Sequence, residues 1–220
     1  MGELNNVTAE GIDGDLVYKD QSGNIICRWD ATNRRLEIPS GSIFAIESGG
    51  AIELEGLTNG APGAGISGGT GTVFKSSVIR IGDIIRTSFL IDLTGLSSST
   101  TDLDIIGTGT AVAYLGQITA AKNGTILSGR MTCLEVPVGG ADDVDLYAAT
   151  EGTGKFDGGI AALTETALVT AGGSWTLGAT KALGAVPAAN QYLYLTGGED
   201  GTADVYTAGK FLIELDGYEA

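Results

Sequence analysis

Residues 73–93 read VFKSSVIRIGDIIRTSFLIDL, and this stretch decides the fold class of the chain. Two runs rich in β-branched and aromatic residues, 73–81 and 84–93, flank the dipeptide Gly82-Asp83. Such side chains favour extended strands, and a two-residue connection that contains glycine is typical of a tight hairpin turn. The stretch therefore predicts an antiparallel strand pair.

Similar short runs, bounded by turn residues, recur to the end of the chain. The further predicted strands are 103–106, 110–119, 125–136, 144–150, 174–177, 191–196, 203–207 and 210–215. The segment 159–169 fits a short helix or another strand, because its Ala and Leu spacing suits both. Many short strands separated by turns predict an all-β chain whose residues 73–220 form a jelly-roll-like β-sandwich.

Residues 1–56 carry shorter strand signals and predict a separate small module. The runs 16–19 and 25–29 flank the turn DQSGN at 20–24, which predicts a hairpin, and a further strand is expected at 34–38. Residues 40–47 (SGSIFAIE) and 48–55 (SGGAIELE) then repeat with a period of eight.

Each copy of this repeat has a Ser-Gly corner and a run in which apolar and polar residues tend to alternate. A strand so short buries too little to be stable alone, and stacking rungs from three chains around one axis supplies the missing core. We therefore expect residues 1–56 to be a β-prism or β-helix-like trimerisation module. An ordinary meander with a chance resemblance between two strands is the alternative.

Residues 57–72 are rich in glycine and are predicted to be a flexible linker between the two modules. Their glycines do not indicate a phosphate-binding loop, since neither a Gly-Lys-Ser/Thr sequence nor a helix pattern follows them.

The composition argues against several classes of function. The chain has no histidine, which is the side chain best suited to proton transfer near neutral pH. Its 12 basic and 27 acidic side chains give a net charge of −15. A surface of this kind repels nucleic-acid phosphates and anionic lipid. We therefore predict a non-enzymatic protein without a cofactor, which binds neither nucleic acid nor membranes.

Three groups of acidic side chains are candidates for a metal site or a catalytic site. The cluster Asp142, Asp143 and Asp145 offers the oxygen ligands that calcium prefers but lacks the spacing of an EF-hand loop, so a solvated turn is the preferred interpretation. Two further groups could act as acid and base in a glycosidase, although no cleft is evident. They are Asp102 with Asp104, and Glu199 and Asp200 with Asp204.

Aromatic residues offer a second kind of candidate. Trp29, Trp175, Tyr192 and Tyr194 could form a platform on which sugars stack, but core or interface positions are commoner for such side chains. Tyr192 and Tyr194 alternate with leucines, so both tyrosines should lie on one face of a strand. We expect that face to contact another subunit.

Residues 14–41, GDLVYKDQSGNIICRWDATNRRLEIPSG, resemble the openings of virion structural proteins of tailed phages. The glycine-rich, histidine-poor C-terminal part looks like a capsid decoration, or cement, protein. The resemblance implies a homotrimer on the outer surface of the virion capsid, with the major capsid protein as its partner. It carries over no catalytic, cofactor or metal residue. Tail-fibre or spike-like appendages that bind receptors or glycans have similar openings and are the alternative.

The most basic part of this acidic chain is the segment that contains Arg28, Arg34 and Arg35. We expect capsid contacts there. In the alternative interpretation these arginines pair with Glu37 and neighbouring carboxylates.

Overall fold

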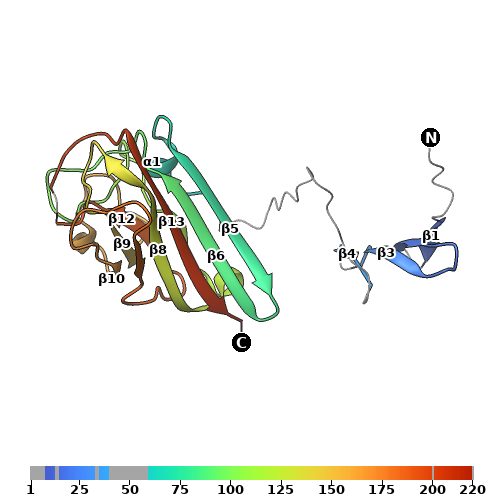
Figure 1. Ribbon diagram of the computed structural model, residues 1–220. Helices are drawn as coiled ribbons and strands as arrows, with labels where there is room; N and C mark the ends of the chain where they lie inside the picture. The colour runs from blue at the N-terminus through green and yellow to red at the C-terminus, as the bar shows by residue number, and fades with distance from the viewer. Residues whose placement is uncertain (1–7, 13–14, 33–34, 40–58, 200, 220) are drawn as a thin grey trace. The chain divides into compact units, whose positions relative to one another are not determined.

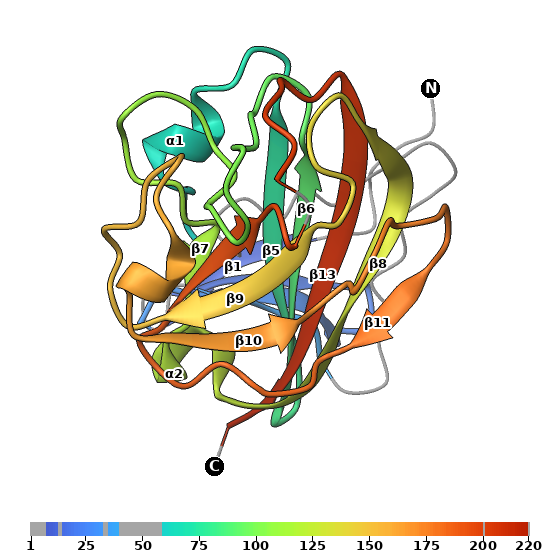
Figure 2. The ribbon, with the colours of Figure 1, turned by 90° about the vertical axis from the view of Figure 1, so that its left-hand side faces the viewer.

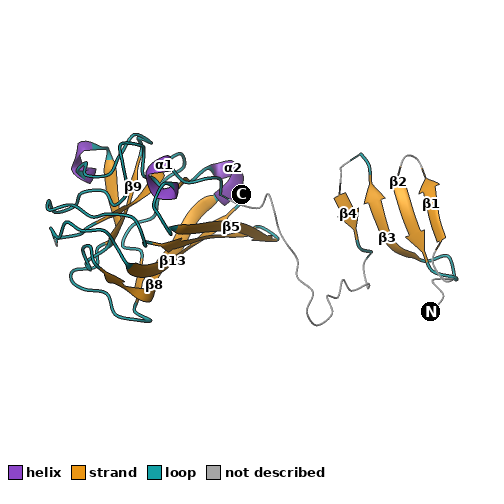
Figure 3. Ribbon diagram, turned by 90° about the horizontal axis from the view of Figure 1, so that it is seen from above, coloured by secondary structure: helices purple, strands orange, loops and turns teal. Residues whose placement is uncertain are grey.

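The computed structural model describes residues 8–12, 15–32, 35–39, 59–199 and 201–219. The chain divides into two compact units, Met1–Leu54 and Glu55–Ala220 (Figure 1). It is all-β, as predicted, with three antiparallel sheets and only very short helices in the described ranges (Figure 3).

The N-terminal unit contains one four-stranded meander. Its strands, in spatial order, are β1 (Thr8–Ile12), β2 (Asp15–Lys19), β3 (Ile25–Asp30) and β4 (Arg35–Glu37). The predicted β2–β3 hairpin is confirmed, because Asp20 Oδ1 accepts the amide N–H groups of Ser22 and Asn24 at 2.9 and 2.8 Å and so organises the turn. The eight-residue repeat at 40–55 lies outside the described residues.

The larger sheet of the C-terminal unit has five strands. In spatial order they are β11 (Thr180–Ala182), β8 (Thr125–Val138), β13 (Ala208–Tyr218), β6 (Ile84–Asp92) and β5 (Val73–Ile81). The predicted hairpin is confirmed, with Ile81 paired to Ile84 across its tight turn. Along β13 every second residue is buried, so one face of this sheet points into the core.

A second sheet packs against that face (Figure 2). Its strands, in spatial order, are β10 (Glu165–Val169), β9 (Asp145–Ala149), β12 (Tyr192–Thr196) and β7 (Gly116–Gln117). Gly116 allows a close approach of the two sheets, since a Cβ atom there would lie 3.0 Å from the Phe89 ring. The result is a sandwich-like unit with one continuous apolar core.

Several predicted strands are loops in the structure. The segment 110–119 forms only β7, because its other backbone groups bond to different partners: Tyr114 O accepts from Gly63 N, whereas Leu115 N donates to Leu193 O. The segments 103–106 and 203–207 form isolated bridges, and 174–177 is irregular. The ambiguous segment 159–169 contains both elements, a 3-10 turn at Ile160–Ala162 and then β10.

The described part of the glycine-rich segment does not behave as the predicted linker. From Asn59 onward it packs in the C-terminal unit, where α1 (Ala64–Ser67) buries Ile66 completely. A Cβ atom on Gly63 would lie 2.2 Å from Val112 O, and one on Gly65 would lie 2.7 Å from a neighbouring carbonyl oxygen. These glycines therefore serve close backbone packing rather than flexibility.

A buried amide network fixes the start of this segment. Asn123, the last residue of α2 (Ala120–Asn123), donates to Asn59 Oδ1 at 2.7 Å and to Thr87 Oγ1 at 2.8 Å. Its own Oδ1 accepts the Thr119 amide at 2.8 Å, and Asn59 Nδ2 donates to Gln117 O at 2.9 Å. Because these groups are shielded from water, each depends on its partner in the network.

We predict that Asn123→Ala lowers the free energy of unfolding by about 2–4 kcal/mol, because it leaves several buried polar groups unpaired. Chemical denaturation followed by fluorescence measures the change. The control Gln117→Ala removes an amide that donates to Asn190 O in an exposed hydrogen bond, and should cost less than about 1 kcal/mol. Equal effects of the two substitutions would contradict the role given to the network.

Candidate functional site

The arginines predicted to contact a partner belong to the N-terminal unit. Arg28, in β3, donates from Nε to Glu37 Oε2 of β4 at 2.9 Å and forms an ion pair with it. Arg35 begins β4, where its position pairs with Asp30. Arg34 lies outside the described residues. Arg28 thus pairs with Glu37, as the alternative interpretation expected, and contact of the arginines with a capsid protein stays a prediction.

An open hollow of about 540 Å³ lies beside this ion pair. Arg28 and Glu37 form its polar part, and Ile25, Ile38 and Pro39 form its apolar part. The combination of aliphatic surface with a half-exposed ion pair suits contact with another protein surface, where an apolar centre and a charged rim occur together.

An exposed apolar row crosses the same small sheet. Leu16 of β2, Trp29 of β3 and Leu36 of β4 are direct cross-strand neighbours, and their side chains remain 41, 45 and 53% exposed. We call these three residues the apolar row. Directly opposite residues share a sheet face and contact one another, so the row is continuous. In the described part of the N-terminal unit no second layer of structure covers it.

The sequence does not predict the apolar row. It indicates Trp29 only as part of a sugar platform, with Trp175, or as a core or interface anchor. Next to the turn at 20–24 the β2–β3 register shifts between Tyr18 and Lys19, so Leu16 lies opposite Trp29. A register counted from the turn alone would pair Leu16 with Arg28 and place Trp29 on the other face.

Tyr192 and Tyr194 lie on one face of β12, as their alternation predicted, but the chain's own loops cover that face. Tyr194 is completely buried, and its hydroxyl donates to Glu151 O at 2.7 Å. A Cβ atom on Gly152 would lie 2.8 Å from the Tyr192 ring. Tyr194 is therefore a core residue that offers no surface to another subunit, and Tyr192 is only partly accessible.

Burial raises the pKa of Tyr194 to about 12, above its ordinary value of 10.0. A raised folded-state pKa contributes stability that is complete below pH 10 and is lost as the pH rises toward 12. Tyr194→Phe removes this contribution and leaves Glu151 O without its donor, at a cost of about 1–3 kcal/mol at neutral pH. We predict that the stability difference between the two proteins narrows from pH 10 to 12 in urea denaturation. A constant difference would contradict a buried hydroxyl at this position.

Trp175 is also part of the core. Its Nε1 donates to Val144 O at 2.8 Å, and its ring packs edge-on against Phe211 with centroids 5.3 Å apart. Because Trp175 and Tyr194 are both buried, they form no sugar-stacking surface. Trp29, in the other unit, is the exposed tryptophan.

The acidic cluster is not the solvated turn that was expected. Asp143 and Asp145 are 5 and 3% exposed, respectively. Burial raises the pKa of Asp145 to about 6, although a hydrogen bond from the Ala171 amide opposes the shift. Ionised carboxylates are costly to bury, so this part of the unit holds unfavourable electrostatic energy.

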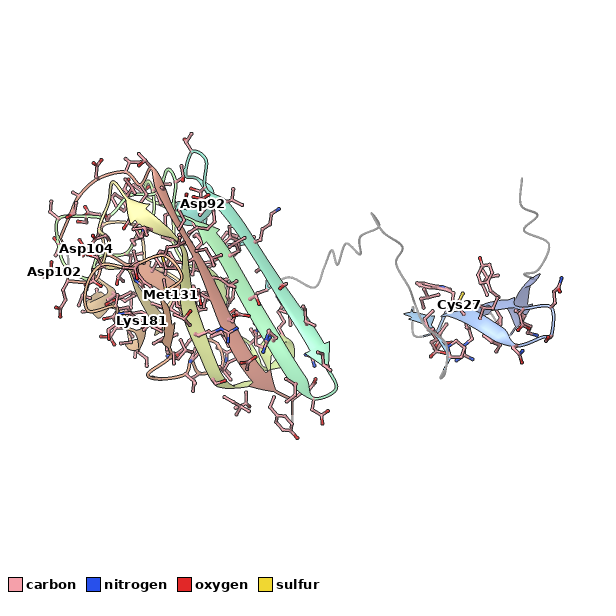
Figure 4. All side chains as sticks on the ribbon, in the orientation of Figure 1. Cys27, Asp92, Asp102, Asp104, Met131 and Lys181 are labelled. Atoms are coloured by element: carbon pink, nitrogen blue, oxygen red, sulfur yellow. The ribbon has the colours of Figure 1, made fainter. Side chains whose placement is uncertain are left out.

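The carboxylates considered for glycosidase chemistry lie in different environments. Asp102 is exposed and Asp104 is buried, although both belong to the loops on the side of the unit away from the five-stranded sheet (Figure 4). Leu103 between them has a φ of 60°, which turns the backbone at this point. Glu199 and Asp204 are exposed, and Asp200 lies outside the described residues.

Across the described ranges, no group of three or more His, Cys, Asp and Glu side chains is arranged to hold a metal ion. Those ranges also contain no helix with the length and apolar character needed to cross a membrane. No protein-family model matches the chain, and no curated protein or solved structure matches it.

Proposed function

We propose that this chain is a virion structural protein, a homotrimer that decorates the outer surface of a tailed-phage capsid and stabilises it by binding the major capsid protein lattice. The apolar row is the observation that supports the proposal, because apolar side chains exposed in one continuous row favour contact with another protein surface. The resemblance of residues 14–41 to tailed-phage virion proteins supports the capsid as the place of action.

Self-association through the apolar row follows from the small size of the N-terminal sheet. In the residues that the structure describes, the four short strands form a single layer, and isolated β-structure of this size is marginally stable in water. Burying the exposed parts of Leu16, Trp29 and Leu36 contributes on the order of 2–4 kcal/mol per protomer. In a trimer three such rows cover one another.

The acidic charge of the chain limits contact elsewhere on its surface. A net charge of −15 makes most approaches between copies repulsive, so apolar contact is favoured where charge is low. The proposal includes the finer architecture expected from the sequence, a trimeric β-prism or β-helix-like module within residues 1–56 and a jelly-roll arrangement in the C-terminal domain.

A trimer suits mechanical stabilisation of a shell. Each copy in the trimer contributes one weak contact with the shell. Once the first contact has formed, the other two copies are held near their own sites on the shell, so they bind at a high effective concentration. Separating neighbouring capsid subunits would then expose surface that the trimer had covered. The hollow beside Arg28 and Glu37 is our candidate for this contact.

We predict that Leu36→Glu converts a trimer into monomers at micromolar concentration, because it places three charges in the centre of the apolar contact. Analytical ultracentrifugation measures the mass in solution. The control Ile84→Glu changes a side chain of equal exposure, 52 against 53%, in the C-terminal unit. Dissociation by Ile84→Glu with a persistent Leu36→Glu trimer would place the contact elsewhere.

Binding to undecorated capsids tests the function itself. Adding the wild-type protein should raise the temperature at which the capsids release DNA, and Leu36→Glu should lose this effect because a monomer lacks multivalency. Ile84→Glu should retain it. Wild-type trimers that neither bind capsids nor raise this temperature would refute a decoration role, and labelling of tails would favour the appendage alternative.

A further inference from the structure

The end of the β9–β12 ladder brings three oxygen-bearing side chains near one another. Asp145 of β9 is paired with Thr196 of β12, the last pair of the ladder, and beyond it Asp143 lies against Gly198. A Cβ atom on Gly198 would lie 2.7 Å from Asp143 Cγ, which shows how closely the Asp143 carboxylate approaches this strand end. Asp145 and Thr196 project from the same side of the ladder because they are directly opposite each other, and the Asp143 carboxylate is close enough to that of Asp145 to repel it.

This group contains the buried oxygens that lack partners. In the described ranges two buried side-chain atoms have no hydrogen-bond partner, Asp143 Oδ1 and Thr196 Oγ1, and both belong to it. Asp143 is 95% buried and Thr196 completely so. The other oxygen of Asp143 accepts the Glu199 amide at 3.2 Å, which fixes the carboxylate in place. Buried oxygens without partners are rare, and two of them at the same end of a strand ladder indicate a binding site for a ligand.

The negative charge of these side chains also favours a bound cation. The positive side chain that acts on Asp145 is Lys181, but Lys181 Nζ donates to Ala171 O and lies 5.2 Å from the centroid of the Trp175 ring (Figure 4 labels Lys181). Lys181 is therefore engaged elsewhere. Two buried carboxylates so close together repel one another, and a bound cation would remove this repulsion.

We propose that Asp143, Asp145 and Thr196 form a binding site for one Ca²⁺ ion. The donor set consists only of oxygen atoms, as hard cations require, and calcium accepts irregular arrangements in which backbone carbonyls and water complete the coordination. Magnesium demands a near-ideal octahedron and is less well suited. With two carboxylates the site should be weak, with a dissociation constant of about 0.1–1 mM, as in extracellular calcium-binding modules.

The site has a structural purpose that is independent of the proposed capsid function. It joins β9 to the strand end at Thr196 and Gly198, where the ladder gives way to loops. A ligand that binds only the folded state raises the unfolding temperature, and this stabilisation grows with the logarithm of one plus the ratio of ligand concentration to dissociation constant.

Thermal unfolding of the full chain, first treated with a chelator, tests the site. We expect 10 mM CaCl₂ to raise the unfolding temperature by several degrees, 10 mM MgCl₂ to raise it much less, and Asp143→Asn to lose the calcium response. The control Asp142→Asn changes the neighbouring, less buried carboxylate and should keep the response. An equal response in Asp143→Asn, or none in the wild type, would overturn the proposal.

A second variant tests the site even if Asp143→Asn does not fold. Thr196→Val keeps the side-chain shape and removes a hydroxyl that has no hydrogen-bond partner, so the calcium-free protein should remain folded and at least as stable. Calorimetric titration should show calcium affinity reduced about tenfold. Unchanged affinity would overturn the role of Thr196 and with it the proposed site.

Discussion

Strand β13 holds the C-terminal unit together, because it pairs with β6 on one side and with β8 on the other along nearly all of its length. Its inward residues Phe211, Ile213 and Leu215 are completely buried in the core shared with the second sheet. Its outward residues form ion pairs with the flanking strands, such as Glu214 with Arg130. This unit therefore has a continuous hydrophobic core of its own.

The N-terminal sheet is the opposite case. Its four short strands satisfy one another's backbone groups but leave the apolar row in contact with water. Isolated β-structure of this size is marginally stable in water, and exposed apolar side chains favour contact with another surface. The two units therefore differ in how far the described residues cover their apolar side chains.

Alternation and turn chemistry predicted the β5–β6 and β2–β3 hairpins, because both signals act between residues close in sequence. They failed where distant segments decide the structure. Alternation placed Tyr192 and Tyr194 on one face but could not show that the loop containing Gly152 covers it. Composition likewise predicted a linker at 57–72, whereas those glycines allow backbone contact with Val112. The burial of Asp143 could not be predicted for the same reason, since it depends on contact with Gly198, which is distant in sequence.

Electron cryomicroscopy of capsids to which the purified protein has been added tests the central claim most directly. We predict density on the outer surface of the shell with threefold symmetry, in which the apolar rows of three chains face one another and the N-terminal sheets form one shared core. Single copies on the shell with the row exposed to solvent, or density confined to the tail, would contradict a trimeric decoration protein.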